Sequence, residues 1–372
     1  MPRNDLLEVK DGDVTGALRG FLKSLLEKGL LDALLVPVAV PSGKNAVQTL
    51  VEDIGQIDRC EPLAPVMPVN SAKIVSSLTR TGAPGKKIGV VLRSCEIRAL
   101  QELVKLKQAD LTNLVLIGTD CFGTYSVSDY SEAGVSTNTF LKNALGDSDP
   151  KLRQSCKVCR YPMPLNADLF IGLIGMDLNR ELLIRAETAE GERLLGALGI
   201  DGDGDGGAAK RDAAVAKLAA VREKEKNEFL QKAAAEFGGL QNLLSALSSC
   251  VACHNCRVAC PICYCRECLL DSPTFTQWEG DKYLEWAGKK GALRLPADSL
   301  LFHLVRLNHM GASCVACGLC EDACPNGIQV FKLFRLGGAK VQQLFDYLPG
   351  RSLEDELPLT AFKEKEFKNF EL

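Results

Sequence analysis

Two runs of cysteine in the C-terminal third have a spacing suited to redox chemistry. Each run reads C-x2-C-x2-C-x3-C-P. Three closely spaced thiolates can hold three irons of one [4Fe-4S] cubane, and the fourth cysteine of such a run commonly reaches the other cluster. The first run contains Cys250, Cys253, Cys256 and Cys260, and the second contains Cys314, Cys317, Cys320 and Cys324.

The two runs predict two [4Fe-4S] clusters, with the spacing of bacterial two-cluster ferredoxins. The expected ligand sets are Cys250, Cys253, Cys256 and Cys324 for one cluster, and Cys314, Cys317, Cys320 and Cys260 for the other. Zinc is the competing metal, but it prefers two separated cysteine pairs that close one tetrahedron. Transfer of single electrons is therefore the expected chemistry.

Four more cysteines lie in the first half of the chain. Cys95 and Cys121 each follow a predicted strand, and Cys156 and Cys159 form a C-x2-C pair. Because the carboxyl ends of parallel strands gather ligand sites at one rim of a sheet, these thiols are expected to converge. Four thiolates suit either a third [4Fe-4S] cluster or a zinc ion, and the spacing alone is compatible with both.

The elements that must position these thiols alternate between strand and helix. Apolar residues from Leu18 to Leu26 form one face of a helix that follows Asp11-Gly12-Asp13. Buried strands are predicted at 34–40, 87–92, 114–118 and 168–174, with a helix at 96–106. This alternation predicts an α/β layer with parallel pairing.

Changes in composition divide the chain into four parts. We expect an α/β domain over 1–200, then a linker and a long helix over 201–246. The linker is DGDGDGG at 201–207, and the helix, rich in Ala, Lys and Glu, runs from 208 to about 237. A small α+β ferredoxin-like domain over 247–350 and a charged tail over 351–372 complete the chain.

Bulk composition narrows the class of protein. The 372 residues carry a formal net charge of −3, which gives no reason to expect nucleic acid or an anionic membrane as a partner. The longest apolar stretch, 30–40, is interrupted by Asp32 and Pro37 and is too short to span a bilayer. Sixteen cysteines in a long chain with a polar N-terminus indicate metal binding rather than disulfides. A soluble cytoplasmic protein is expected.

Several segments resemble the β-subunit family of deazaflavin-coenzyme hydrogenases and formate dehydrogenases. They are VKDGDVTGALRGFLKSLLEKGLLDALLV, IGVVLRSCEIRAL, LIGTDCFGTYS and RQSCKVCRYPMPLNADLFIGLIG. The likeness covers roughly residues 8–235. In that family the subunit binds FAD beside a [4Fe-4S] cluster. The resemblance implies that the ligands of this flavin-side cluster are Cys95, Cys121, Cys156 and Cys159.

The resemblance also suggests where FAD would bind. The family's glycine-rich loop before the first helix corresponds to Lys10, Asp11, Gly12, Val14 and Thr15. A helix N-terminus offers free N–H groups to a pyrophosphate, but Asp13 replaces the family's second glycine. Asp13 is a natural N-cap and brings a negative charge near the phosphates.

A second candidate stretch for the flavin contains Asn70, Ser71 and Lys73. Arg93 could stabilise a reduced anionic flavin. For each residue named for the flavin, ordinary capping or surface packing is the alternative.

Three cysteines between the two runs are not needed by two clusters. Cys263, Cys265 and Cys268 could ligate another metal, replace an assigned ligand, or pack as buried thiols. His254 is either an ordinary loop residue or a hydrogen-bond partner of a cluster sulfur.

The sequence predicts an electron-transfer β-subunit of a formate dehydrogenase or hydrogenase complex. It would relay electrons between a catalytic partner subunit, three clusters, FAD and a soluble carrier, for which the resemblance suggests a deazaflavin coenzyme. The chain has no catalytic triad or paired carboxylates, and no G-x-G-x-x-G after a strand for NAD. There are two alternatives. One is a flavin-free iron–sulfur wire, a subunit that passes electrons between an oxidoreductase and a heterodisulfide reductase-type complex; the other is a zinc-binding scaffold protein.

Overall fold

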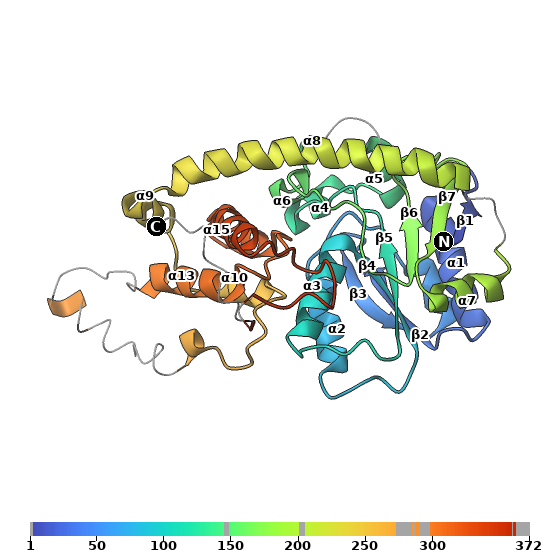
Figure 1. The fold of residues 1–372 in the computed structure, drawn as a ribbon, viewed down its shortest axis with the longest axis horizontal. Helices are drawn as coiled ribbons and strands as arrows, with labels where there is room; N and C mark the ends of the chain where they lie inside the picture. The colour runs from blue at the N-terminus through green and yellow to red at the C-terminus, as the bar shows by residue number, and fades with distance from the viewer. Residues whose placement is uncertain are drawn as a thin grey trace.

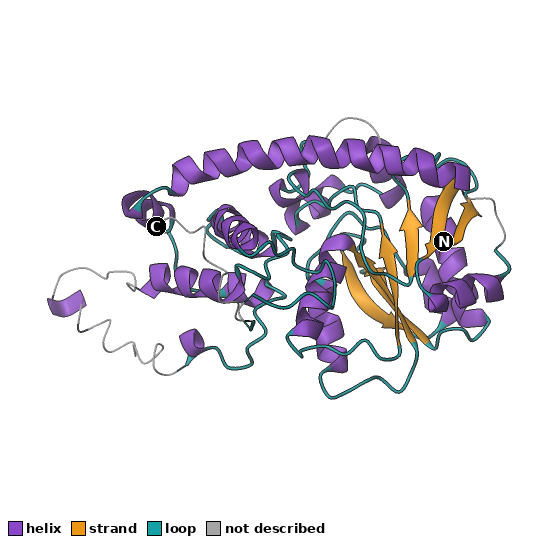
Figure 2. Ribbon diagram, viewed as in Figure 1, coloured by secondary structure: helices purple, strands orange, loops and turns teal. Residues whose placement is uncertain are grey.

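A mixed seven-stranded sheet forms the N-terminal half of the chain (Figures 1 and 2). The computed structural model describes residues 3–144, 149–200, 205–272, 285, 287–289, 298–358 and 360–361. The strands are β1 (Arg3–Glu8), β2 (Ala33–Ala39), β3 (Ala46–Val51), β4 (Ile88–Arg93), β5 (Leu114–Thr119), β6 (Leu169–Gly172) and β7 (Glu181–Ala186). Their order across the sheet is β1-β7-β6-β5-β4-β2-β3.

The centre of this sheet is parallel, as the sequence predicts. Strands β2, β4, β5 and β6 pair in parallel, while β3 and β7 pair antiparallel to their neighbours. Strand β1 is antiparallel to β7 and therefore runs in the same direction as β6. The carboxyl ends of β1, β2, β4, β5 and β6 consequently share one rim, where ligand sites of α/β sheets form.

Helices cover both faces of the sheet. On one face α1 (Val14–Glu27) packs with the 3-10 helix η1 (Ile54–Arg59), α5 (Thr137–Ala144) and α7 (Ala189–Leu198). The opposite face carries α2 (Ser71–Thr79) and α3 (Ser94–Lys105). Two short helices, α4 (Val127–Ala133) and α6 (Gln154–Lys157), lie in the long connection between β5 and β6.

The long helix α8 (Asp205–Phe237) runs beside both halves of the molecule (Figure 1). The helix predicted for 208–237 is confirmed. Of the predicted linker, 201–204 lie outside the described residues and 205–207 belong to α8. The helix contacts β1, α6 and the C-terminal α15. It therefore fixes the C-terminal part relative to the sheet.

The C-terminal part packs on the sheet face that α2 and α3 occupy. Its elements are α9 (Leu240–Ala246), α10 (Asn255–Ala259), the 3-10 helix η2 (Leu269–Asp271), α13 (Asp298–Met310), α14 (Leu319–Asp322) and α15 (Val330–Leu344). The described residues of 247–358 contain no strand. Leu100 of α3 belongs to the same apolar cluster as Phe302 and Phe334, so the two halves share a core.

The segment after α15 returns to α3. Arg98 Nε donates to the carbonyl of Pro349 over 2.8 Å, and the Tyr347 hydroxyl donates to Glu102 Oε1 over 2.6 Å. Of the predicted tail, 359 and 362–372 lie outside the described residues. None of the described helices is both long enough and apolar enough to cross a bilayer.

Candidate iron–sulfur and flavin sites

Four cysteines meet at the carboxyl rim of the sheet. Cys95 lies in the first turn of α3 after β4, and Cys121 follows β5 by two positions. Cys156 lies in α6, and Cys159 follows it. All four line one cavity, together with Arg153 and Arg222. The structure thus brings the predicted set together, and we call it the rim set.

The loop around the rim set supplies hydrogen-bond donors to one of its sulfurs. The Thr124 amide donates to Cys156 Sγ over 3.4 Å, and Arg153 Nε donates to Thr124 Oγ1 over 2.9 Å. Gly123 has φ +127°, and a Cβ there would lie 3.1 Å from Cys156 Cβ. Glycine therefore lets this loop pass close to the sulfur ligand.

The protonation of the rim set differs between its members. Burial raises the pKa of the Cys95 thiol well above its usual value, and that of Cys121 to about 11. Burial would also raise the pKa of Cys156, but the Arg153 guanidinium and the hydrogen bonds from Thr124 outweigh it, so this pKa is lowered. Cys156 therefore reaches the thiolate form, in which cysteine ligates metal, most readily of these three.

A second cavity combines three cysteines of the first run with the last cysteine of the second. Its lining includes Cys250, Cys253, Cys256 and Cys324, and we call these the outer set. Cys253 is exposed, whereas Cys250 and Cys256 are buried. Cys324 of the second run thus joins three cysteines of the first run, as the sequence predicts for one cluster.

The remaining run cysteines form a set between the other two. Burial raises the pKa of Cys314, Cys317 and Cys320. In each case the charge of Cys260 raises the pKa further, more than any other charged group does. Cys260 of the first run thus stands beside the second run. We call these four residues the middle set.

The middle set adjoins the rim set directly. Cys317 lines the cavity of the rim set, and Ser155 Oγ donates to its carbonyl over 3.4 Å. Gly318 has φ +78°, and a Cβ there would lie only 2.3 Å from Ser155 Oγ. Arg153 Nη1 forms an ion pair with Asp322 over 2.5 Å across the same contact. Cys256 of the outer set lies in α10, and Cys260 of the middle set directly follows that helix. The middle set therefore adjoins both of the other sets, and the three follow one another in a row.

Cys263, Cys265 and Cys268 line a separate cavity with Arg306, His309 and Met310. Cys265 is exposed, and Cys263 Sγ lies 4.0 Å from Met310 Sδ. Across the described part of the chain, no three His, Cys, Asp or Glu side chains gather in a group that could hold a metal ion. The four ligands of a cubane surround a volume rather than a single ion, and the rim set and the outer set each surround a cavity in that way.

Two amides in the first turn of α1, where the flavin pyrophosphate is expected, already have hydrogen-bond partners. The Gly16 amide donates to Asp13 Oδ1 over 2.9 Å, and the Thr15 amide donates to Asn138 Oδ1 over 3.2 Å. The hydrogen bonds from Gly16 and Asn138 lower the pKa of Asp13. Asp13 is thus the N-cap of α1, as predicted, and it holds a negative charge at this helix terminus. Gly12 beside it has φ +72° and faces Asn179.

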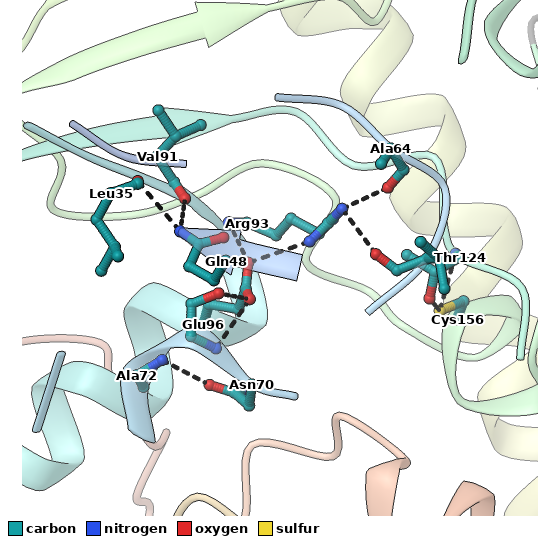
Figure 3. Close-up of polar contacts among 12 residues, drawn as sticks. Leu35, Gln48, Ala64, Asn70, Ala72, Val91, Arg93, Glu96, Thr124 and Cys156 are labelled. Atoms are coloured by element: carbon teal, nitrogen blue, oxygen red, sulfur yellow. Dashed lines mark hydrogen bonds and ion pairs between the residues drawn. The ribbon is translucent and has the colours of Figure 1, made fainter. Parts of the chain in front are cut away.

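The second flavin stretch lies on the opposite face of the sheet. Glu96 Oε1 accepts from the Ser71 amide over 3.0 Å, and Glu96 Oε2 accepts from the Arg93 amide over 2.9 Å. Figure 3 shows the Arg93 guanidinium extended between Glu96 and the Ala64 carbonyl. Lys73 donates to the carbonyl of Val258 in the C-terminal part.

One buried polar group of this stretch has no hydrogen-bond partner among the described residues. Asn70 caps α2 through its Oδ1, while its buried Nδ2 has no hydrogen-bond partner among the described residues. The first helix and this stretch belong to different apolar clusters, which lie on opposite faces. A flavin that contacted Lys10–Thr15 and Asn70 together would have to pass over the rim.

Sequence reasoning missed the polar side chains that accompany the cysteines. His303 Nε2 lies 3.5 Å from Cys250 Sγ, and Arg306 Nη1 donates to Cys256 Sγ over 3.0 Å. Both belong to α13, where they interrupt an otherwise apolar face. That interruption is the signal that could have identified them. His254 stacks on Phe302 and pairs with Asp271.

Known proteins resemble this chain both in its C-terminal part and over nearly its whole length. A family described as a 4Fe-4S dicluster domain matches residues 246–328. The F420-dependent formate dehydrogenase subunit beta of Methanocaldococcus jannaschii is 27% identical over 92% of this chain and 93% of its own length. The subunit beta of F420-dependent formate dehydrogenase 1 from Methanococcus maripaludis is 26% identical over 94% of each chain.

A solved structure also matches the fold in part. It is a chain of the F420-reducing [NiFe] hydrogenase complex from Methanosarcina barkeri, studied with xenon. The match has a TM-score of 0.44 and 14% identity, and it covers 64% of this chain and 93% of that one.

The C-terminal part of the chain contains a 4Fe-4S dicluster domain, and the curated relatives are subunits of oxidoreductase complexes. The resemblance drawn from the motifs is confirmed. Over nearly its whole length the chain is similar to the β-subunits of F420-dependent formate dehydrogenases.

Proposed function

We propose that this chain is the β-subunit of a formate dehydrogenase or hydrogenase complex and relays electrons between a catalytic partner subunit and a soluble carrier. The observation that carries the proposal is the row of three cysteine sets, in which Cys317 of the middle set lines the cavity of the rim set. The relatives named for F420-dependent formate dehydrogenase support F420, a deazaflavin coenzyme, as the carrier.

The cysteines would hold three [4Fe-4S] clusters in this row. When bound, such clusters pass single electrons, and a flavin exchanges one or two, so together they convert between the two kinds of carrier. The chain's own residues would fix the spacing. Arg153 ties the rim set to Asp322 near the middle set, and Gly318 allows the two loops to touch. The exposed Cys253 marks the outer set as the place where the partner subunit would exchange electrons.

FAD would bind at the rim beside Cys95. The buried Asn70 Nδ2, which lacks a partner among the described residues, is the donor that this stretch offers. Ser71 and Arg93 flank it through Glu96. Their shared carboxylate fixes the orientation of both side chains, so the rim presents a preorganised polar edge next to the rim set.

A flavin-free iron–sulfur wire, toward a complex such as a heterodisulfide reductase, is the second candidate. The occupied N-terminus of α1 favours it, because Asp13 and Asn138 already accept from the amides that a pyrophosphate would need. The two candidates differ in whether this chain alone can pass a hydride to F420.

An anaerobic assay with an artificial donor distinguishes them. The full chain, purified with its iron, is mixed with reduced methyl viologen and F420, and the loss of F420 absorbance is followed. We expect F420 reduction that is lost when FAD is removed from the protein and restored when FAD is added back. Iron-loaded protein that contains no flavin and leaves F420 unchanged after FAD addition would instead support the wire. Protein without iron and sulfide would contradict both candidates.

A further inference from the structure

Arg306 carries a positive charge that no acidic side chain of the described residues compensates. It lies on α13 with 3% of its surface exposed, and its guanidinium stands 5.3 Å from the Phe302 ring centre and 4.7 Å from that of Phe334. No carboxylate among the described residues forms an ion pair with it, and its Nε has no hydrogen-bond partner there. A buried charge in such surroundings is costly unless an opposite charge faces it.

The groups that face Arg306 include members of two cysteine sets, and Cys263 lines a further cavity beside it. Nη1 donates to Cys256 Sγ over 3.0 Å, and Nη2 donates to the Cys256 carbonyl over 3.1 Å. Cys256 is a member of the outer set. Nη2 also lies 3.9 Å from Met310 Sδ, and that sulfur lies 3.8 Å from Cys260 Sγ of the middle set. The guanidinium therefore stands at the junction of the two sets.

We propose that Arg306 is the buried counter-charge of the two C-terminal clusters and raises the reduction potential of both. The inference rests on the proposed clusters. Four thiolates around a cubane leave it anionic, so a fixed positive charge nearby favours addition of an electron. Charge and hydrogen bonds at the sulfurs are among the factors that set cluster potentials. The anionic clusters in turn would offset the cost of burying the arginine.

The rim set has an arginine of the same kind, which serves as an internal comparison. Arg222 of α8 lines the rim cavity, donates to the carbonyl of Phe122 over 2.7 Å and to that of Cys159 over 3.4 Å, and has no carboxylate partner among the described residues. It lies apart from Arg306, so replacing each arginine should affect a different cluster.

The test is a redox titration of anaerobically purified full-length protein, followed by EPR. The wild type is compared with Arg306→Gln, Arg306→Lys and Arg222→Gln, with iron measured in each. At the wild-type midpoint potential of the C-terminal clusters, Arg306→Gln should lower the ratio of reduced to oxidised clusters about tenfold. This corresponds to a midpoint potential lower by ~59 mV for a one-electron couple. Arg306→Lys should retain most of the wild-type ratio. Arg222→Gln should shift the rim cluster alone.

The outcomes separate this inference from the proposed function. Wild-type protein without cluster signals would refute the clusters themselves. Normal iron with unchanged midpoints in Arg306→Gln would overturn the role of Arg306 and leave the clusters intact. Loss of iron from Arg306→Gln but not from Arg306→Lys would support the need for charge. Loss from both would show that guanidinium packing is what matters, and would also overturn the proposal.

Discussion

Cys95→Ser is expected to remove about four of about twelve irons per chain and to leave the C-terminal clusters in place. Cys95 lines the cavity of the rim set and belongs to neither cysteine run. A serine hydroxyl is a much poorer iron ligand than a thiolate, so the rim cluster should fail to assemble. Iron analysis and EPR of the reduced protein measure both parts of this result.

Cys60→Ser is the matched control for this substitution. Cys60 is buried and its Sγ contacts the Gln56 carbonyl at 3.8 Å, but it lines none of the three cysteine cavities. It should retain all of the iron. If Cys95→Ser kept the same iron and the same EPR signals as Cys60→Ser, the rim set would not be a cluster site.

Arg211→Met is expected to cost about 3–5 kcal/mol of stability, because it leaves a buried carboxylate without its partner. Arg211 Nη2 and Asp120 Oδ1 are 2.9 Å apart, and neither side chain is exposed. Asp120 Oδ2 also accepts from the amides of Leu173 and Ile174. Since Asp120 directly precedes Cys121, the substitution should loosen the rim set as well. Anaerobic unfolding, followed by circular dichroism and by loss of cluster absorbance, measures both effects.

Arg193→Met provides the comparison for a surface ion pair. Arg193 on α7 pairs with Glu190 over 2.8 Å, and its side chain is 48% exposed. Exposed pairs of this kind contribute about 0–1 kcal/mol. Equal stability of Arg211→Met and Arg193→Met would contradict a structural role for the buried pair in docking α8.

The parallel centre of the sheet could be predicted because its strands are continuous apolar runs. Strand β4, Ile88–Arg93, is buried at every position, and such a pattern needs no knowledge of its neighbours. The edge strands gave no such signal. In β1, Arg3–Glu8, only Asp5 is buried, and its pairing partner β7 lies about 180 residues later in the chain. Antiparallel edges of this kind depend on long-range pairing.

The outer and middle sets were predictable from spacing and the rim set from its position after parallel strands, whereas the charges around the sets were not. The exchange of Cys324 and Cys260 between the runs follows from a known motif. Arg222 lies in a helix whose charged residues resemble a solvated face, and only the contact of α8 with the rim shows that it is buried. The flavin stretches were the weakest prediction, because short polar segments cap helices as readily as they bind ligands.

The most direct test of the account is the content of iron, sulfide, zinc and flavin in anaerobically purified protein. Three four-iron clusters predict about twelve irons and about twelve sulfides per chain, together with one FAD. Distinctly more iron would assign Cys263, Cys265 and Cys268 to a further site. Zinc without sulfide would contradict the account, because the three cysteine sets would then be structural rather than a path for electrons.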